Sequence, residues 1–200
     1  MLSRVFVGAF GSVWNLKRLC IEIRAPLLKK ILIKIYGLYQ YENGSSIAWN
    51  SKFHGMPCFP HGMKNIFISG GAEIGRNCVI FQQVTIGSNT LQDSGGIGAP
   101  VIGEYCYIGA GAKIIGNIKI GNNVRIGANA VVYKDVADNS VVFSGEQRTV
   151  SKAVPLDNRF YSYHNRWVYF CDGQWVSVTD ELVLRKLMSS QSIQKFIECL

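Results

Sequence analysis

A branched aliphatic residue recurs every six positions through the middle of this chain. The position is filled by Ile68, Ile74, Ile80, Ile86, Ile102, Ile108, Ile114, Ile120, Ile126 and Val132. A fixed short period is the sequence signature of a solenoid, and a six-residue period indicates a parallel β-helix. Each repeat supplies one short strand and one turn, so three repeats close a triangular coil. The repeat therefore predicts an all-β core.

A second inward position follows four residues after each of these except Ile86, where the period is interrupted. It holds Ala72, Cys78, Val84, Cys106, Ala112, Ile118, Val124, Ala130 and Val136. Small and aliphatic side chains of this kind are expected to stack under the branched residues of the next coil. The turns between strands carry Asn77, Asn117, Asn123 and Asn129. Asparagine tolerates left-handed backbone angles, so these residues are expected at sharp corners.

The period is interrupted at two places. After Ile86 comes an extra piece, residues 88–100, which is rich in Gly, Ser, Asn and Asp and is predicted to leave the β-helix as a loop. Upstream, an irregular stretch before Ile68 contains Pro60-His61-Gly62. In a rigid scaffold the irregular loops usually carry function. These two interruptions are therefore the first places to look for a site.

Composition divides the chain into three predicted domains. Residues 1–44 form a basic helical extension, which carries most of the net charge of +8. Residues 45–146 form the β-helix, which is nearly neutral and so lacks the charge of a nucleic-acid groove. Residues 147–200 contain an aromatic hairpin, with its turn at 171–174, and a helical tail. This last part is expected to cap the open end of the β-helix or to cover a neighbouring subunit.

Residues 27–36 have the pattern of a basic amphipathic helix. One reading packs its apolar face on the β-helix or on a neighbouring subunit, and the other attaches residues 1–40 peripherally to an anionic membrane surface. Lys and Arg recur too often for a transmembrane span, and the first residues lack a secretory signal pattern.

The six cysteines show no metal-like spacing. A reducing, cytoplasmic setting is expected.

The three histidines are the first candidates for chemistry. His61 lies between Pro60, which restricts the backbone, and Gly62, which leaves room for a ligand. From position alone, a structural and a catalytic role both stay open for it. His54 lies in a turn of an early coil and His164 in the aromatic tail, so both are expected to be structural or exposed. No metal site is expected, because neither cysteines nor carboxylates cluster with the histidines.

Four segments of the chain carry a resemblance to a known family. They are FPHG at 59–62, IFQQVTIG at 80–87, IGAGAK at 108–113 and IGANAVVYKDV at 126–136. Together they resemble the hexapeptide-repeat acyltransferases, in the serine-acetyltransferase-like branch. The resemblance implies a left-handed parallel β-helix, an exception to the usual right-handed crossover. It also implies a homotrimer with active sites between subunits and acetyl-CoA as the donor substrate.

By this resemblance His61 is the general base. It would remove the proton from an acceptor hydroxyl as that oxygen attacks the thioester carbonyl. Backbone N–H groups at Gly87 and Ser88 match the region that stabilises the thioester oxyanion. Direct transfer of the acetyl group is expected, without a covalent enzyme intermediate, because no Cys or Ser lies in a nucleophile setting beside a base.

The same resemblance assigns the cofactor contacts. Ala110 and Ala128 match positions whose backbone holds the pantetheine arm. Tyr133 and Lys134 match contacts nearer the nucleotide, where a lysine can face phosphate. These four residues, with His61, Gly87 and Ser88, make up the expected site.

Two departures from the serine acetyltransferases concern the acceptor. Those enzymes pair the histidine with an Asp on the preceding coil, where this chain has Ser46, and they carry Arg-His-Pro where this chain has Gly98-Ala99-Pro100. Glu42 or a backbone carbonyl is left to orient His61. With its short basic N-terminus, the chain resembles instead the polysaccharide-locus O-acetyltransferases, whose acceptors are sugar hydroxyls.

The main hypothesis is therefore an acetyl-CoA-dependent O-acetyltransferase. Its acceptor would be a sugar hydroxyl of a capsular, O-antigen or exopolysaccharide glycan or of its precursor. Serine O-acetyltransferase is the alternative within the same enzyme class. A non-catalytic β-helix used for assembly is the alternative from another class. No nucleic-acid partner is expected.

Overall fold

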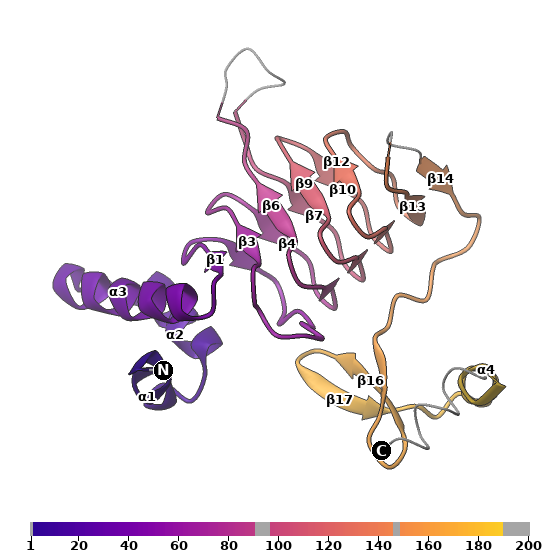
Figure 1. Ribbon diagram of the computed structural model, residues 1–200, viewed down its shortest axis with the longest axis horizontal. Helices are drawn as coiled ribbons and strands as arrows, with labels where there is room; N and C mark the ends of the chain where they lie inside the picture. The colour runs from indigo at the N-terminus through magenta and orange to yellow at the C-terminus, as the bar shows by residue number, and fades with distance from the viewer. Residues whose placement is uncertain (1, 91–96, 146–148, 190–200) are drawn as a thin grey trace.

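The computed structural model describes residues 2–90, 97–145 and 149–189. Its centre is a parallel β-helix, in which short strands follow one another around stacked coils (Figure 1). Three sheets, called A, B and C here, form the sides of the coil. The predicted parallel β-helix, with helices before it, is therefore confirmed.

Sheet A contains β1 (Ser46–Ile47), β3 (Phe67–Ile68), β6 (Thr85–Gly87), β9 (Lys113–Ile115) and β12 (Val131–Val132). Sheet B contains β2 (Lys52–Phe53), β4 (Glu73–Ile74), β7 (Val101–Ile102) and β10 (Lys119–Ile120). Sheet C contains β5 (Val79–Ile80), β8 (Tyr107–Ile108), β11 (Arg125–Ile126) and β13 (Ser140–Val142), with β14 (Thr149–Ser151) antiparallel at its end.

The strand register stacks the six-residue positions on one another. Ile68 pairs with Ile86, and Ile86 pairs with Ile114, so like side chains lie in line along the axis. Every residue of the two predicted inward positions is buried, with at most 8% of its surface exposed. Cys78 and Cys106 are among them, and each thiol donates to a backbone carbonyl of the next coil. The sequence therefore predicted the core correctly.

Left-handed residues form the corners of the coils. Asn77, Asn123 and Asn129 have φ of 59°, 55° and 57°, as expected for turn asparagines. The expectation is wrong for Asn117, because the preceding Gly116, at φ 110°, adopts the positive angle instead. A glycine at this corner accommodates that backbone without strain, which leaves the asparagine in an ordinary conformation.

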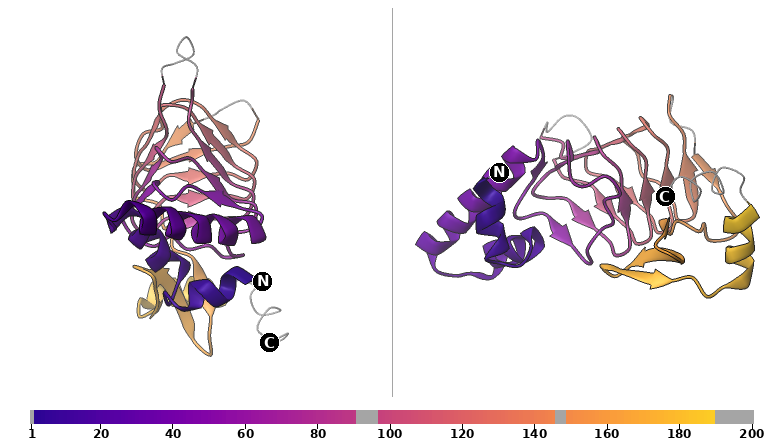
Figure 2. Two further views of the ribbon diagram at one scale, coloured as in Figure 1. Left: turned by 90° about the vertical axis from the view of Figure 1, so that its left-hand side faces the viewer. Right: turned by 60° about the horizontal axis from the view of Figure 1, so that its bottom comes forward.

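Three helices lie against the N-terminal end of the β-helix (Figure 2). They are α1 (Leu2–Gly8), α2 (Val13–Glu22) and α3 (Pro26–Glu42). From α2, Trp14 stacks on Phe59 at 5.8 Å between ring centroids and meets Phe53 edge-on at 5.2 Å. The helices thus cover the first coil, whose inward side chains have no coil before them to pack against.

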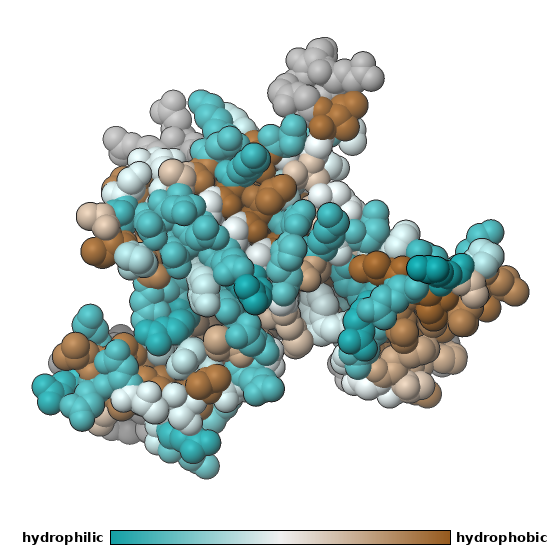
Figure 3. All heavy atoms as spheres, turned by 180° about the vertical axis from the view of Figure 1, so that it is seen from behind, coloured by the Kyte–Doolittle hydropathy of each residue, from teal (hydrophilic) through white to brown (hydrophobic). Residues whose placement is uncertain are grey.

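One face of α3 is buried and the other is exposed. Leu32 and Tyr36 pack in a cluster with α1, α2 and the first coil, whereas Leu27, Leu28 and Ile31 stay exposed. Figure 3 shows such apolar side chains beside hydrophilic ones over the helical extension, on the right of that view. In the described part of the chain, no helix is long and apolar enough to cross a membrane. Packing on the β-helix is confirmed, and membrane contact stays a prediction.

The C-terminal part forms a three-stranded antiparallel sheet of β15 (Tyr161–Tyr163), β16 (Trp167–Cys171) and β17 (Gln174–Ser177). Cys171 pairs with Gln174, which confirms the predicted hairpin turn. The helix α4 (Glu181–Ser189) confirms the first part of the helical tail, and residues 190–200 lie outside the described residues.

The hairpin and α4 do not cap the open end of the β-helix, so that expectation is wrong for them, although β14 pairs with β13 at the end of sheet C. After β14 the tail runs back along the β-helix, and its hairpin lies beside the early coils (Figure 1). Covering of a neighbouring subunit stays a prediction. Asn158 donates to the carbonyl of Tyr105 at 2.8 Å, and Asp172 N donates to Asn77 Oδ1 at 2.8 Å. The tail is held there because it satisfies polar groups of several coils and covers apolar groups of sheet C.

Candidate active site

The expected site residues lie along two edges of sheet A. The corner where the chain passes from sheet C to sheet A, called the C/A edge, carries His61, Ala110 and Ala128. The corner between sheets A and B, called the A/B edge, carries Gly87, Ser88, Tyr133 and Lys134. The structure therefore groups these residues in two rows, with sheet A between them. Ala128 and Tyr133 lie before and after the same strand of sheet A, so the distance between the two rows along that strand is at most about 17 Å.

His61 lies in the irregular segment between Cys58, which bridges to Val79, and strand β3. Its side chain is exposed, and its ring lies 5.9 Å from the ring of Phe81. None of the described residues forms a hydrogen bond with the imidazole. Both ring nitrogens are therefore available to a substrate hydroxyl at this edge.

The candidates for orienting His61 lie elsewhere or are engaged. Ser46 is on β1, exposed on the outer face of sheet A and paired with Phe67. Glu42 accepts hydrogen bonds from the backbone N–H, at 3.2 Å, and from the hydroxyl of Ser3 in α1. The Glu42 carboxylate therefore ties α3 to α1.

The other two histidines lie outside this row. His54, between sheets B and C, is 2.6 Å from Glu73 through Nε2. That hydrogen bond, helped by the charge of Lys52, lowers the pKa of the Glu73 carboxyl. The His164 ring meets Trp175 at 4.8 Å on the tail hairpin. Both histidines are exposed, as expected, so His61 is the histidine of the C/A edge.

A cavity of about 330 Å³ opens on sheet A next to the C/A edge. Asn65, Phe67, Gln83, Thr85 and Lys113 line it. The Lys113 ammonium donates to the Gln83 carbonyl at 2.7 Å, and Gln83 has φ of 63°. The sequence reasoning did not single out these residues. The available signal was their position, because three of them directly precede an inward isoleucine and must point outward from the strand.

Aromatic rings connect the tail to His61. Phe81, beside His61, lies 5.1 Å from Tyr107 and 6.2 Å from Phe160. Phe160 in turn lies 6.1 Å from Trp175, which is 42% exposed. The tail therefore contributes side chains next to the candidate base, which its distance along the chain did not indicate.

The A/B edge holds the start of the predicted loop. Asn89 and Gly98 exchange two backbone hydrogen bonds, of 2.7 and 3.1 Å, so the excursion leaves the β-helix where it was expected. Residues 91–96 within it lie outside the described residues. Further along the edge, the Lys134 ammonium lies 5.4 Å from the exposed Tyr133 ring. The lysine charge thus lies near an aromatic face, and the nucleotide contact of these two residues stays a prediction.

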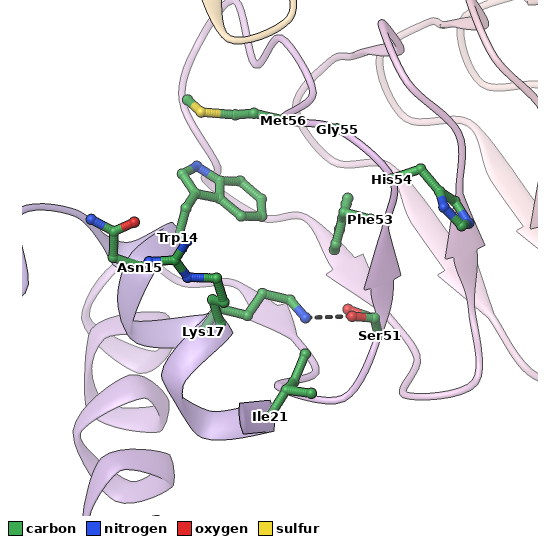
Figure 4. Close-up of a pocket in the computed structure, with 10 residues that line it drawn as sticks. Trp14, Asn15, Lys17, Ile21, Ser51, Phe53, His54, Gly55 and Met56 are labelled. Carbon is green, nitrogen blue, oxygen red and sulfur yellow. Dashed lines mark hydrogen bonds between the residues drawn. The ribbon is translucent and has the colours of Figure 1, made fainter. Parts of the chain in front are cut away.

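A larger cavity, of about 540 Å³, lies between α2 and the first coil (Figure 4). On one wall Lys17 donates to the carbonyls of Trp49, at 2.9 Å, and of Ser51. Burial lowers the pKa of Lys17 to about 8. The first coil has no coil before it to pair with its carbonyls, so Lys17 caps the end of the β-helix.

Among the described residues, no group of His, Cys, Asp and Glu is arranged so that it could hold a metal ion.

Comparison with known proteins adds a family match. Residues 99–134 match the model of the bacterial transferase hexapeptide (six repeats). A serine acetyltransferase of Synechococcus elongatus is 40% identical over 102 residues, which cover 49% of this chain and 41% of that protein. Over its β-helix, this chain is similar to serine acetyltransferases.

Solved structures support the same similarity. Serine acetyltransferase from Neisseria gonorrhoeae aligns with a TM-score of 0.59 and 27% identity, covering 71% of this chain and 52% of that one. A serine acetyltransferase solved in complex with CoA aligns with a TM-score of 0.58 and 26% identity, covering 69% and 55%. These neighbours imply the expected left-handed winding. The chain spans about half the length of the proteins that it matches.

The comparisons support one of the two resemblances given for the sequence. They support the hexapeptide transferases and the serine acetyltransferases. They give no support to a particular affinity with polysaccharide-locus O-acetyltransferases. Among the hypotheses, they therefore favour the alternative, serine O-acetylation, over the main one.

Proposed function

We propose that this protein transfers an acetyl group from acetyl-CoA to an acceptor hydroxyl, with His61 as the general base. The observation that carries the proposal is the exposed imidazole on the C/A edge, in one row with Ala110 and Ala128. In the reaction, a ring nitrogen takes the hydroxyl proton as the oxygen attacks the thioester carbonyl. The C–S bond then breaks, and the imidazolium returns the proton to the departing CoA thiolate.

The two rows of site residues belong to one centre only if two subunits meet. We propose a trimer in which the C/A edge of one subunit faces the A/B edge of the next. His61 of one subunit would then face Gly87 and Ser88 of its neighbour, whose backbone N–H groups stabilise the oxyanion. Tyr133 and Lys134 would hold the nucleotide end of acetyl-CoA. Sequence similarity to trimer-forming acyltransferases supports this arrangement.

L-Serine is the acceptor that the comparisons support best. However, this chain lacks two features of the serine acetyltransferases: it has Ser46 in place of their Asp, and Gly98-Ala99-Pro100 in place of their Arg-His-Pro. A serine zwitterion needs counter-charges for its carboxylate and its ammonium. A sugar hydroxyl is the second candidate, and the aromatic rings running from Phe81 to Trp175 favour it, since rings pack well against the apolar faces of sugars.

The test measures release of the CoA thiol from acetyl-CoA with a thiol-reactive dye. His61→Ala should lower turnover by about 10²–10⁴-fold, as expected for loss of a general base. His54→Ala is the matched control and should keep the activity. Full activity of His61→Ala would show that another group is the base.

The acceptor is found with L-serine, nucleotide sugars and oligosaccharides assayed side by side. Turnover of L-serine alone would establish the first candidate and exclude the second. Turnover of sugars alone would do the reverse. If acetyl-CoA is consumed with none of them and is not bound, the assembly alternative gains.

A further inference from the structure

The outward side of α3 is largely apolar, although the water-facing side of a surface helix is usually polar. Alternating spacings of four and three residues place on one side of this helix Leu27, Ile31, Lys34, Leu38 and Tyr41. This stripe is called the α3 face here. All five residues are exposed, Leu27 by 73% and Tyr41 by 83%. Packing on the β-helix therefore leaves an apolar stripe in water.

The α3 face is also positively charged. Lys30 lies one turn before Lys34, and both side chains are exposed. None of the ion pairs among the described residues includes either lysine. Glu42 is the one acidic residue in the sequence of α3, and it accepts hydrogen bonds from Ser3. The face thus presents aliphatic and ammonium groups together.

A second copy of this chain fits the α3 face poorly. A two-fold contact would bring the same patch of both copies together, so the lysines of the two chains would meet without an acidic partner. Lys34 lies in the middle of the stripe, and burying its ammonium against another protein face without a counter-charge would be costly. At a lipid surface the lysine stem lies along apolar groups while the ammonium stays among the headgroups.

We propose that the α3 face docks on an anionic lipid surface, with the helix axis in the plane of the membrane. Leu27, Ile31 and Leu38 enter the boundary between headgroups and acyl chains, and the two lysines face lipid phosphates. Tyr41 suits this boundary, because its ring is apolar and its hydroxyl is polar. Docking requires no acetyl transfer, so it goes beyond the proposed function.

The helix α1 adds apolar groups at the same end of the molecule. Its Val5 and Phe6 are exposed, and α1 packs on α3. Figure 2 shows the helices together at the N-terminal end of the β-helix. Docking through this end leaves the coils that carry the C/A edge outside the lipid contact, so bound protein can still receive acetyl-CoA.

Vesicle binding tests the proposal without any transfer reaction. The full chain is sedimented with vesicles of about two parts phosphatidylcholine to one part phosphatidylglycerol, and with vesicles of phosphatidylcholine alone. Binding to the anionic vesicles should be tighter by about tenfold or more, and added salt should weaken it. His61→Ala should bind these vesicles normally while losing acetyl transfer, which separates failure of this proposal from failure of the proposed function.

Two pairs of variants test the apolar and the charged groups. Leu27→Gln should weaken binding to the anionic vesicles by about tenfold, whereas Leu182→Gln, an equally exposed leucine on α4, should leave it intact. Lys34→Gln should weaken the same binding by about fivefold, whereas Lys152→Gln, an exposed lysine after β14, should not change it. All four positions are exposed, so the variants are expected to fold.

Four outcomes would overturn the proposal. One is that the anionic vesicles are not bound, and another is that both kinds of vesicle bind equally. The third is that both Leu27→Gln and Lys34→Gln bind as tightly as the unmodified protein. The fourth is a smaller oligomer in Leu27→Gln, measured by sedimentation velocity, because the α3 face would then belong to a contact between copies of this chain.

Discussion

Lys17 offers a quantitative test of how the first coil is closed. Lys17 is 4% exposed, and its ammonium donates to the carbonyls of Trp49 and Ser51. Burial lowers its pKa from 10.5 to about 8, which means that the folded protein holds the charged form at a cost. Below pH 8 the lysine is protonated in both the folded and the unfolded chain. Between pH 8 and pH 10.5 only the unfolded chain stays fully protonated.

The sign follows from proton binding. Stability rises with pH wherever the unfolded state binds more protons, so the Lys17 contribution to the free energy of unfolding should increase from about pH 8 to about pH 10.5. The pKa difference of about 2.5 corresponds to an increase of about 3 kcal/mol. Buried acids have the opposite effect on the free energy of unfolding. Burial raises the pKa of Cys20, Cys58 and Tyr36, so the folded protein becomes less stable as these groups ionise in the unfolded chain at high pH.

The measured quantity is therefore the difference in the free energy of unfolding between the protein with Lys17 and the Lys17→Met variant. Methionine keeps the apolar stem, never titrates, and leaves the two carbonyls unpaired, which costs about 1–3 kcal/mol for each unmade bond. Both proteins should carry Cys20→Ala, because the Cys20 thiol interacts with Lys17. Urea unfolding at one protein concentration, from about pH 7 to about pH 10.5, gives the two free energies. A difference that stays flat or falls with pH would refute the account of Lys17 as a buried, charged cap.

Three further predictions concern the core, the assembly and the tail. Ile114→Ala should lower the free energy of unfolding by about 2–5 kcal/mol, and Val131→Ala, on the exposed face, by far less; equal losses would contradict the assigned faces. The variants His61→Ala and Lys134→Glu, each inactive alone at low acetyl-CoA, should together restore about a quarter of wild-type activity when equal amounts are reassembled into mixed trimers. A site between subunits can then combine an intact His61 from one chain with an intact Lys134 from its neighbour. No recovery would place each site within one chain. Phe160→Ala should raise the KM for a sugar acceptor several-fold and leave the KM for acetyl-CoA unchanged; a change in the acetyl-CoA value alone would remove the tail from the acceptor side.

The β-helix was predictable because its signal is local and repeated. Each coil needs the same branched side chain at the same place, so the repeats that contain Ile68, Ile86 and Ile114 each indicate the same fold. The loop at 88–100 was predictable for the same reason, since it breaks a strict period. The tail was placed wrongly because its position depends on pairs far apart in sequence, such as Phe81 with Phe160 and Asn77 with Asp172.

The outer face of β5 gave no clear signal for the tail. In β5 both Val79 and Ile80 are apolar, and both are buried, whereas the outward residue of β4, β9, β10 and β11 is charged. The outward residues Phe67, Val101 and Val131 of other strands are also apolar but stay exposed, so an apolar outward residue does not by itself indicate a covering segment.

The period that gives the fold also constrains the chemistry. Three six-residue repeats complete a turn, so Ala110 and Ala128 share an edge with His61, whereas Gly87 and Lys134 fall on the other edge of sheet A. Reacting atoms must approach to about 3–3.5 Å, and a strand of sheet A separates the two rows by far more than that. Either the A/B row takes no part in catalysis, or a second subunit supplies it. If the acetyl transfer uses both rows, the oligomer is part of the active site, and dissociating it should abolish turnover while each subunit stays folded.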